Sequence, residues 1–422
     1  MAQIKLKPNK KFKVLSLFSG CGGMDLGFEG GFITHKGSIN QKLHPDFIEE
    51  YLSNDFVRLK ETKFQTVFSN DILPEAYNAW FRHFSKLGYD VSNIYHTESV
   101  VDLVKAHHKQ GNIFPNDIDI VTGGFPCQDF SVAGKRKGFD STKDHKGNMR
   151  SDNEPSEETR GKLYFWMKQV IDIVKPKIFI AENVKGLTNL GDVKNIIRQD
   201  FSSADANGYI VLDPQVLHAA DYGVPQSRER VIFIGIRKDG LTQEAQKALM
   251  QDTIPQEYNP YPLITHNYHI KNEKLCPFQT VRNVFLQLKE PNETDDESQK
   301  SYSKAKYMGK HCQGQSEIDL DGIGPTIRSE HHGNIEYRRL STEHGGRYTE
   351  ELKQGLQERR LTPRECAMIQ TFPPDYEFVF NKPTSVSTSG AYKIIGNAVP
   401  PLLAYNIARR IEDLWTLYFG EI

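Results

Sequence analysis

A single cysteine stands directly after a predicted strand, in the run Gly123-Gly124-Phe125-Pro126-Cys127-Gln128. The apolar stretch 118–121 predicts a buried strand, and the two glycines let the backbone turn sharply at its carboxyl end. Pro126 then stiffens the backbone just before the thiol. Ligands of an open parallel sheet bind just beyond the carboxyl ends of its strands, so Cys127 is predicted to present a thiol at the mouth of a crevice. Taken alone, a lone cysteine after a strand is more often a small buried hydrophobic residue, and the rest of the chain changes that balance.

A glycine-rich loop follows the first predicted strand, Val14-Leu15-Ser16-Leu17-Phe18. The loop, Ser19-Gly20-Cys21-Gly22-Gly23, has three glycines in four residues, which lets the backbone pass close to a ligand at the N-terminus of the next helix. Strand, glycine loop and helix in this order are typical of the nucleotide-binding start of a doubly wound fold. The glycines lie closer together than in G-x-G-x-x-G, and an ordinary tight turn is the alternative.

A second predicted strand, 66–70, ends in Asp71-Ile72. An acidic residue at this place commonly binds the hydroxyls of a ribose, usually about 20 residues beyond the glycines. The separation here is more than twice as long, which predicts an insertion over residues 31–63.

Further predicted strands cover 177–180, 209–212 and 230–235, with helices at 74–84 and 163–174. This alternation predicts an α/β fold, with a parallel sheet covered by helices on both faces. The alternation stops near residue 240, and residues 259–390 are predicted to form a second, smaller lobe. A final amphipathic helix reaches about Phe419 and is expected to pack back on the first lobe.

The composition narrows the class of protein. Lys and Arg number 53 against 54 Asp and Glu in 422 residues, so a nucleic acid partner has to meet a locally basic face. The five cysteines are odd in number and contain no C-x-x-C pair, which argues against a disulfide framework or a zinc site and for a reducing cytosol. The basic start has no apolar segment, so no signal peptide is expected. No apolar stretch of the sequence is long enough to span a bilayer, so no membrane span is expected.

Seven stretches, taken in order, resemble the cytosine-C5 DNA methyltransferases, above all the bacterial enzymes of restriction–modification systems. They run nearly from end to end and together are highly specific: 17–23 (LFSGCGG), 69–71 (SND), 123–128 (GGFPCQ), 181–184 (AENV), 226–230 (QSRER), 359–366 (RRLTPREC) and 396–399 (GNAV).

The resemblance implies a Rossmann-like catalytic domain that binds S-adenosylmethionine, made of 1–258 plus 391–422, and a small DNA target-recognition domain over 259–390. Residues 132–140 match the family's mobile catalytic loop, which a polar stretch at 141–159 extends beyond the family pattern. The cofactor site would consist of Phe18, Gly20, Cys21, Gly22, Gly23, Asp71, Ile72, Glu98, Gly124, Pro126, Leu163, Asn397 and Val399.

The resemblance also implies how the chemistry proceeds. The Cys127 thiolate would add to carbon-6 of cytosine, which makes carbon-5 nucleophilic, and Arg228 and Arg230 would favour ionisation of the thiol and grip the base oxygen and a phosphate. Glu182 would hold a proton for ring nitrogen-3, because burial raises the pKa of a carboxyl. Such an enzyme has to flip its target base out of the duplex. The residues expected to contact DNA are Gln128, Ser131, Lys135, Arg136 and Lys137.

We therefore expect a monomeric enzyme of the bacterial cytoplasm, without a metal, that methylates cytosine in double-stranded DNA and protects it from a partner restriction endonuclease. Three alternatives stay open: a transfer-RNA cytosine-C5 methyltransferase, a DNA-binding protein with a vestigial catalytic lobe, and a dehydrogenase suggested by the glycine loop alone. The sequence does not predict which DNA site is read.

Overall fold

The central sheet has eight strands among the residues that the computed structural model describes, which are 11–126, 163–189, 192–329, 335–382 and 384–420. The strand order is β10-β11-β8-β7-β1-β5-β6, and β9 also pairs with β11. In chain order the strands are β1 (Phe12–Leu17), β5 (Phe64–Asn70), β6 (Tyr95–His96), β7 (Ile120–Gly124), β8 (Ile178–Val184), β9 (Tyr209–Val211), β10 (Gln215–His218) and β11 (Glu229–Arg237).

Only part of this sheet is parallel, which corrects the prediction of a parallel sheet. Strands β8, β7, β1, β5 and β6 pair in parallel. Strand β11 pairs antiparallel with β8, β9 and β10. Between β8 and β11 the chain passes through α6, β9 and β10, and β11 then runs back beside β8 in the opposite direction.

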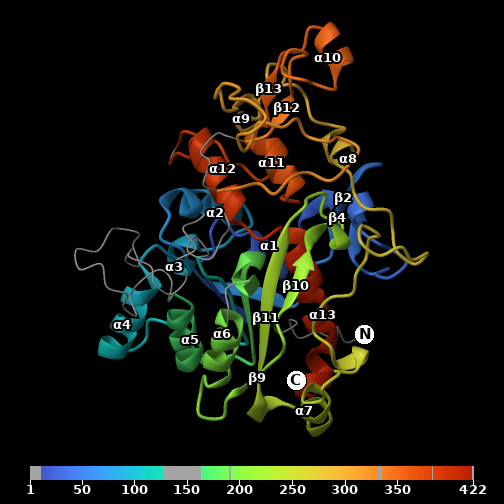
Figure 1. Ribbon diagram of the computed structural model, residues 1–422. Helices are drawn as coiled ribbons and strands as arrows, with labels where there is room; N and C mark the ends of the chain where they lie inside the picture. The colour runs from blue at the N-terminus through green and yellow to red at the C-terminus, as the bar shows by residue number, and fades with distance from the viewer. Residues whose placement is uncertain (1–10, 127–162, 190–191, 330–334, 383, 421–422) are drawn as a thin grey trace, which may run out of the picture.

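Helices cover both faces of the sheet, as predicted (Figure 1). Alternate side chains of a strand point to opposite faces. Val14 and Ile120 accordingly belong to one apolar core, shared with α1 (Gly23–Glu29), α2 (Pro74–Lys86) and α13 (Pro401–Phe419). Leu15 and Val121 belong to a second core, shared with α4 (Val100–Gln110), α5 (Leu163–Val174) and α6 (Val193–Ser202).

The C-terminal helix α13 packs against α1, which confirms that the chain's end returns to the first lobe. A Cβ placed on Gly27 of α1 would lie 2.4 Å from the Cβ of Ala404 in α13. Only a glycine permits so close an approach of the two helices. The first and last segments of the chain are therefore parts of one packed unit.

Residues 31–63 form a separate antiparallel sheet of β2 (Ile33–His35), β4 (Phe56–Leu59) and β3 (Ile48–Tyr51), where the insertion was predicted. This small sheet docks on the segment that begins the predicted second lobe. Asn40 Nδ2 donates to the carbonyls of Thr265 (2.8 Å) and Lys274 (2.9 Å). His266 Nε2 lies 3.0 Å from the Gly37 carbonyl.

Within residues 259–397 the described elements are short, and those from 297 to 397 gather at one end of the molecule (Figure 1). They are α8 (Val281–Phe285), α9 (Glu297–Lys300), β12 (Tyr337–Arg339), α10 (Thr349–Lys353), β13 (Arg359–Arg360), α11 (Pro363–Ile369) and α12 (Thr388–Asn397). The remaining helices are α3 (Val91–Ile94), α7 (Gln243–Leu249) and short 3-10 turns. No helix among the described residues has the length and apolarity needed to cross a membrane.

Candidate active site

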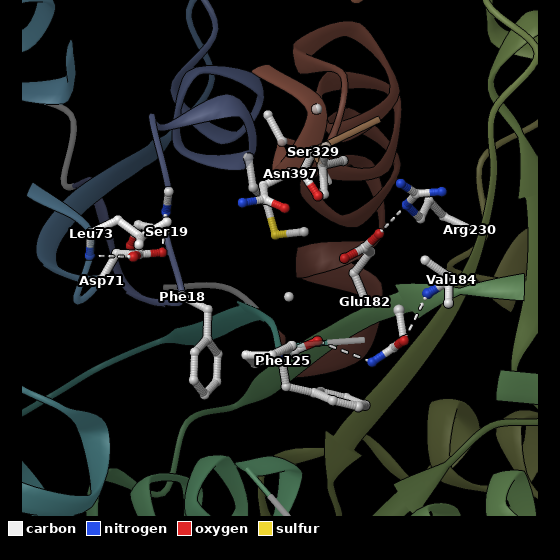
Figure 2. A pocket seen from close by; sticks show the side chains of 18 of the residues that line it. Phe18, Ser19, Asp71, Leu73, Phe125, Glu182, Val184, Arg230, Ser329 and Asn397 are labelled. Atoms are coloured by element: carbon white, nitrogen blue, oxygen red, sulfur yellow. Dashed lines mark hydrogen bonds and ion pairs between the residues drawn. The ribbon is translucent and has the colours of Figure 1, made fainter. Parts of the chain in front are cut away.

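A cavity of about 700 Å³ opens at the carboxyl ends of β1, β5, β7 and β8. Figure 2 shows Phe18 and Asp71 on one side of it and Glu182 and Arg230 on the other. The ends of parallel strands meet at one edge of a sheet, so segments far apart in the sequence converge here. Nine of the residues predicted to bind the cofactor line this cavity: Phe18, Gly20, Asp71, Ile72, Gly124, Pro126, Leu163, Asn397 and Val399.

Asp71 is tied to the glycine loop by its side chain. Its Oδ2 accepts a hydrogen bond from the Gly20 N–H (3.0 Å), and its Oδ1 accepts one from the Leu73 N–H (2.9 Å). Burial raises the pKa of Asp71, and these N–H groups together with Lys393 oppose the rise. A carboxylate has about four acceptor positions, so Asp71 keeps acceptor capacity for a ligand hydroxyl.

Cys21, Gly22 and Gly23, also predicted for the cofactor site, are buried behind the cavity wall rather than lining it. Gly22 has a φ of +82°, and a Cβ on it would lie 2.7 Å from the ring of Trp80. A Cβ on Gly23 would lie 2.2 Å from the Val399 carbonyl. These glycines are needed for close packing, which brings the loop against the C-terminal 398–399 stretch.

Glu98 is exposed and is not one of the residues that line the cavity, whereas its neighbours Ser99 and Val100 are. The Glu98 backbone carbonyl accepts a hydrogen bond from Asn70 Nδ2 at 2.7 Å. Its position beside the cavity is thus set through the backbone.

Glu182 and Arg230 form a buried ion pair on the opposite wall, with 2.6 Å between Arg230 Nε and Glu182 Oε1 (Figure 2). Glu182 lies on β8 and lines the cavity. Arg230 lines the cavity from the adjacent antiparallel strand β11. Burial raises the pKa of Glu182, while Arg230 and Arg228 act to lower it. The net direction is upward, which favours a carboxyl that can hold a proton.

Two contacts fix Glu182 relative to the chain that leads to Cys127. Gly124 at the end of β7 is the register partner of Glu182, and a Cβ on Gly124 would lie 2.8 Å from Glu182 Oε2. Asn183 Nδ2 donates to the Phe125 carbonyl at 3.0 Å. The carboxyl therefore lies directly beside the backbone of Gly124, three residues before Cys127 in the sequence.

Arg228 does not line the cavity, although it was predicted to act beside Arg230. It is fully buried and donates hydrogen bonds to backbone carbonyls of Ile327, Gly396 and Ala398. Of the two arginines predicted to act on the thiol and the base, only Arg230 thus lines the cavity.

Cys127 and the residues expected to contact DNA, Gln128, Ser131, Lys135, Arg136 and Lys137, lie outside the described residues, as do the loop 132–140 and its extension 141–159. The described chain reaches Pro126, which lines the cavity.

Two features of the site were missed from the sequence. The buried Asp25 carboxylate accepts hydrogen bonds from Ser16 Oγ (2.5 Å), Ser69 Oγ (3.1 Å) and Trp80 Nε1 (2.7 Å), which joins β1, β5 and α2 beneath the glycine loop. The sequence feature that could have indicated Asp25 is its position in the first turn of the helix that follows the glycine loop. The second feature is the stretch 326–329, which lines the cavity from within the predicted second lobe and carries no sequence signal that we identified.

One group of possible metal ligands, His218, Asp221 and His269, occurs among the described residues, and none of the three lines the cavity. His269 Nδ1 lies 2.9 Å from Asp221 Oδ2, and His218 Nδ1 accepts the Ala220 N–H. Contacts within the chain account for all three side chains, and the prediction that the enzyme needs no metal stays a prediction.

Comparison with known proteins decides the family. The model of the C-5 cytosine-specific DNA methylases matches residues 12–413. The chain belongs to this family. The C-5 methylase is 32% identical to the Type II methyltransferase M.BsuRI of Bacillus subtilis, over 97% of the chain and 81% of that relative. It is also 32% identical to M.BspRI of Lysinibacillus sphaericus, over 97% and 84% of the two chains.

Solved structures show the same fold at lower identity. DNMT2 of Spodoptera frugiperda aligns with a TM-score of 0.54 at 19% identity, and the alignment covers 96% of the methylase and 100% of the DNMT2 chain. Dnmt2 of S. pombe aligns with a TM-score of 0.53 at 16% identity, over 96% and 99%. The predicted Rossmann-like methyltransferase fold is confirmed, and the dehydrogenase suggested by the glycine loop is excluded by the family.

Proposed function

We propose that this methylase transfers a methyl group from S-adenosylmethionine to carbon-5 of a cytosine flipped out of a specific duplex DNA site, with Cys127 as the nucleophile. The observation that carries the proposal is the Glu182–Arg230 pair, whose carboxyl lies beside Gly124, three residues before the thiol. A buried carboxyl with a raised pKa, a cation and the backbone that leads toward Cys127 thus line one cavity.

The chemistry requires this combination. The Cys127 thiolate adds to carbon-6, and the new S–C bond makes carbon-5 enamine-like. The negative charge that develops at nitrogen-3 is met by a proton on Glu182, while Arg230 holds the other carboxyl oxygen and orients it. Loss of the carbon-5 proton after methyl transfer breaks the S–C bond and restores the thiolate. A water is our candidate acceptor for that proton.

The cavity fits S-adenosylmethionine, which supplies an electrophilic methyl group on a sulfonium when bound. Asp71 offers acceptor positions for ribose hydroxyls, and Phe18 and Ile72 offer apolar surface for the adenine. Asn397 and Val399 close the site from the C-terminal side, where Gly23 allows the loop to reach Val399. Leu163, Gly124 and Pro126 complete the wall.

Residues 1–258 and 391–422 are proposed as the catalytic domain and 259–390 as the target-recognition domain that reads double-stranded DNA. Gln128, Ser131, Lys135, Arg136 and Lys137 are proposed to contact the DNA. The enzyme is further proposed to be a monomer of the bacterial cytoplasm that protects DNA from a partner restriction endonuclease. The names of the bacterial relatives as Type II methyltransferases support the pairing with an endonuclease.

Covalent trapping tests the proposal. Duplex DNA with 5-fluorocytosine at the methylated position should form a denaturation-resistant adduct with the enzyme in the presence of S-adenosylmethionine, because fluorine cannot leave as a cation. Cys127→Ser should lose the adduct and methylation, because a hydroxyl is a far weaker nucleophile than a partly ionised thiol.

Cys312→Ser is the matched control, because Cys312 is an exposed free cysteine that does not line the cavity. It should trap as the wild type does. An adduct that persists in Cys127→Ser, or none in an active wild type, would refute Cys127 as the nucleophile. Methyl transfer to duplex DNA and to transfer RNA is measured in parallel. Methylation of transfer RNA alone would show that the substrate is RNA and not DNA.

A further inference from the structure

Arg228 is one of the largest fully buried side chains among the described residues. Its NH2 nitrogen donates to the carbonyls of Gly396 (2.8 Å) and Ala398 (2.8 Å), and its NH1 nitrogen donates to the carbonyl of Ile327 (3.2 Å). The planar fork of a guanidinium suits several fixed acceptors at once, which a lysine ammonium does not reproduce.

The three carbonyls belong to two segments with different neighbours. Gly396 and Ala398 are part of the wall 396–399, proposed to hold the cofactor. Ile327 belongs to the stretch 324–329 of the proposed target-recognition domain, of which residues 326–329 line the cavity. We call 324–329 the target segment and 396–399 the cofactor wall.

The backbone just before β11 also binds the target segment. The Gly324 N–H donates to the Pro225 carbonyl (2.8 Å), and the Ser227 N–H donates to the Gly324 carbonyl (2.8 Å). The target segment and the cofactor wall also touch directly, because a Cβ on Gly396 would lie 2.6 Å from the backbone of Arg328. Arg228 therefore lies where β11, the target segment and the cofactor wall meet.

Arg230, two residues along, has a different environment. It lines the cavity and pairs with Glu182. Arg230 thus lies in the proposed reaction site, whereas Arg228 binds the backbone segments that surround this site.

We propose that Arg228 is a positioning residue that joins the target segment to the cofactor wall and thereby couples DNA binding to cofactor binding, whereas Arg230 acts at the base. The inference rests on the proposed function for the identity of the two ligands. Coupling between two sites is reciprocal, so whatever DNA does to cofactor affinity, the cofactor does to DNA affinity.

The test compares Arg228→Lys with Arg230→Lys by calorimetry with S-adenosylhomocysteine, with and without a duplex carrying the site mapped in an expressing host. A lysine ammonium cannot bind all three carbonyls at once, so Arg228→Lys should weaken S-adenosylhomocysteine binding by roughly 10-fold. It should also abolish the change in affinity caused by the duplex. Arg230→Lys should change that affinity less than about 3-fold, and should slow single-turnover methylation at saturating cofactor more than Arg228→Lys does.

Wild-type affinity and wild-type coupling in Arg228→Lys, with a turnover loss equal to that of Arg230→Lys, would overturn the inference. If Arg228→Lys does not fold, Gly324→Ala provides the test, since its Cβ would lie 3.1 Å from the Pro225 carbonyl and 2.9 Å from Ile369 Cγ2, outside the cavity lining. It should reduce the coupling, and wild-type coupling there would equally overturn the inference. None of these measurements depends on the Cys127 adduct, so failure here and failure of the nucleophile assignment are distinguishable.

Discussion

At the scale of single residues, the position of the Glu182 carboxyl depends on the room left by a glycine as well as on its ion pair with an arginine. Glu182 reaches its position because Gly124 has no side chain, and Arg230 then holds one of its carboxyl oxygens. Gly124→Ala should displace the carboxyl and slow single-turnover methylation by about 100-fold, the effect of a misplacement near 1 Å. The adjacent Gly123→Ala is the control, because its Cβ would meet the flexible end of Met167 at 3.0 Å. Equal slowing by both variants would show that the space for Glu182 is not what matters.

At the scale of elements, buried charges connect the short elements of the second lobe. Arg339 of β12 and Arg359 of β13 both bind Glu290, at 2.9 Å each. Arg339 also binds Glu351 of α10, and Arg359 also binds Glu365 of α11. These ion pairs thus link β12, β13, α10 and α11, in addition to the apolar contacts that α11 makes with the core.

This network predicts a pH dependence of stability. Burial tends to raise the pKa of Glu290, but Arg359 and Arg339 outweigh it and lower the pKa from 4.5 to about 2. The ionised carboxylate therefore stabilises the fold above pH 4.5, and this stabilisation is lost as the pH falls toward 2. Glu290→Gln should cost roughly 2–3 kcal/mol of unfolding free energy at pH 7, and the difference from wild type should shrink between pH 4.5 and 2. Urea unfolding across this range measures it.

Glu293→Gln removes an exposed carboxylate three residues away and should leave the unfolding free energy within about 0.5 kcal/mol of wild type at each pH. A Glu290→Gln difference that stays constant between pH 7 and pH 2 would contradict the assigned network.

At the scale of the whole molecule, the two chain ends build one unit through the packing of α13 on α1, and the proposed target-recognition domain lies between them in the sequence. Grafting residues 259–390 of a family member that methylates another site should change the methylated sequence and preserve S-adenosylmethionine affinity. The small sheet of residues 31–63 docks on this lobe through Asn40 and His266. A hybrid that carries both 31–63 and 259–390 of the donor should therefore unfold at a higher temperature than the hybrid that carries 259–390 alone. Methylome sequencing of the host reads the outcome, and a folded, active hybrid that keeps the original site would place base recognition elsewhere.

The sequence by itself determined the family, the order of most strands and helices, the insertion over 31–63 and part of the cavity lining. It succeeded because these features are local: hydrophobic periodicity, glycines at strand ends and ordered motifs. It did not determine the antiparallel edge of the sheet, since apolar strands look alike whichever way they run.

Only the tertiary structure separated Arg228 from Arg230. The spacing of two residues is the same for an arginine that faces substrate and for one that binds buried carbonyls, and the difference lies in partners about 100 and 170 positions away in the sequence. The same reason explains why Asp25 and the stretch 326–329 were missed. Hydrogen bonds between distant segments depend on how those segments pack, and no local pattern in the chain encodes their meeting.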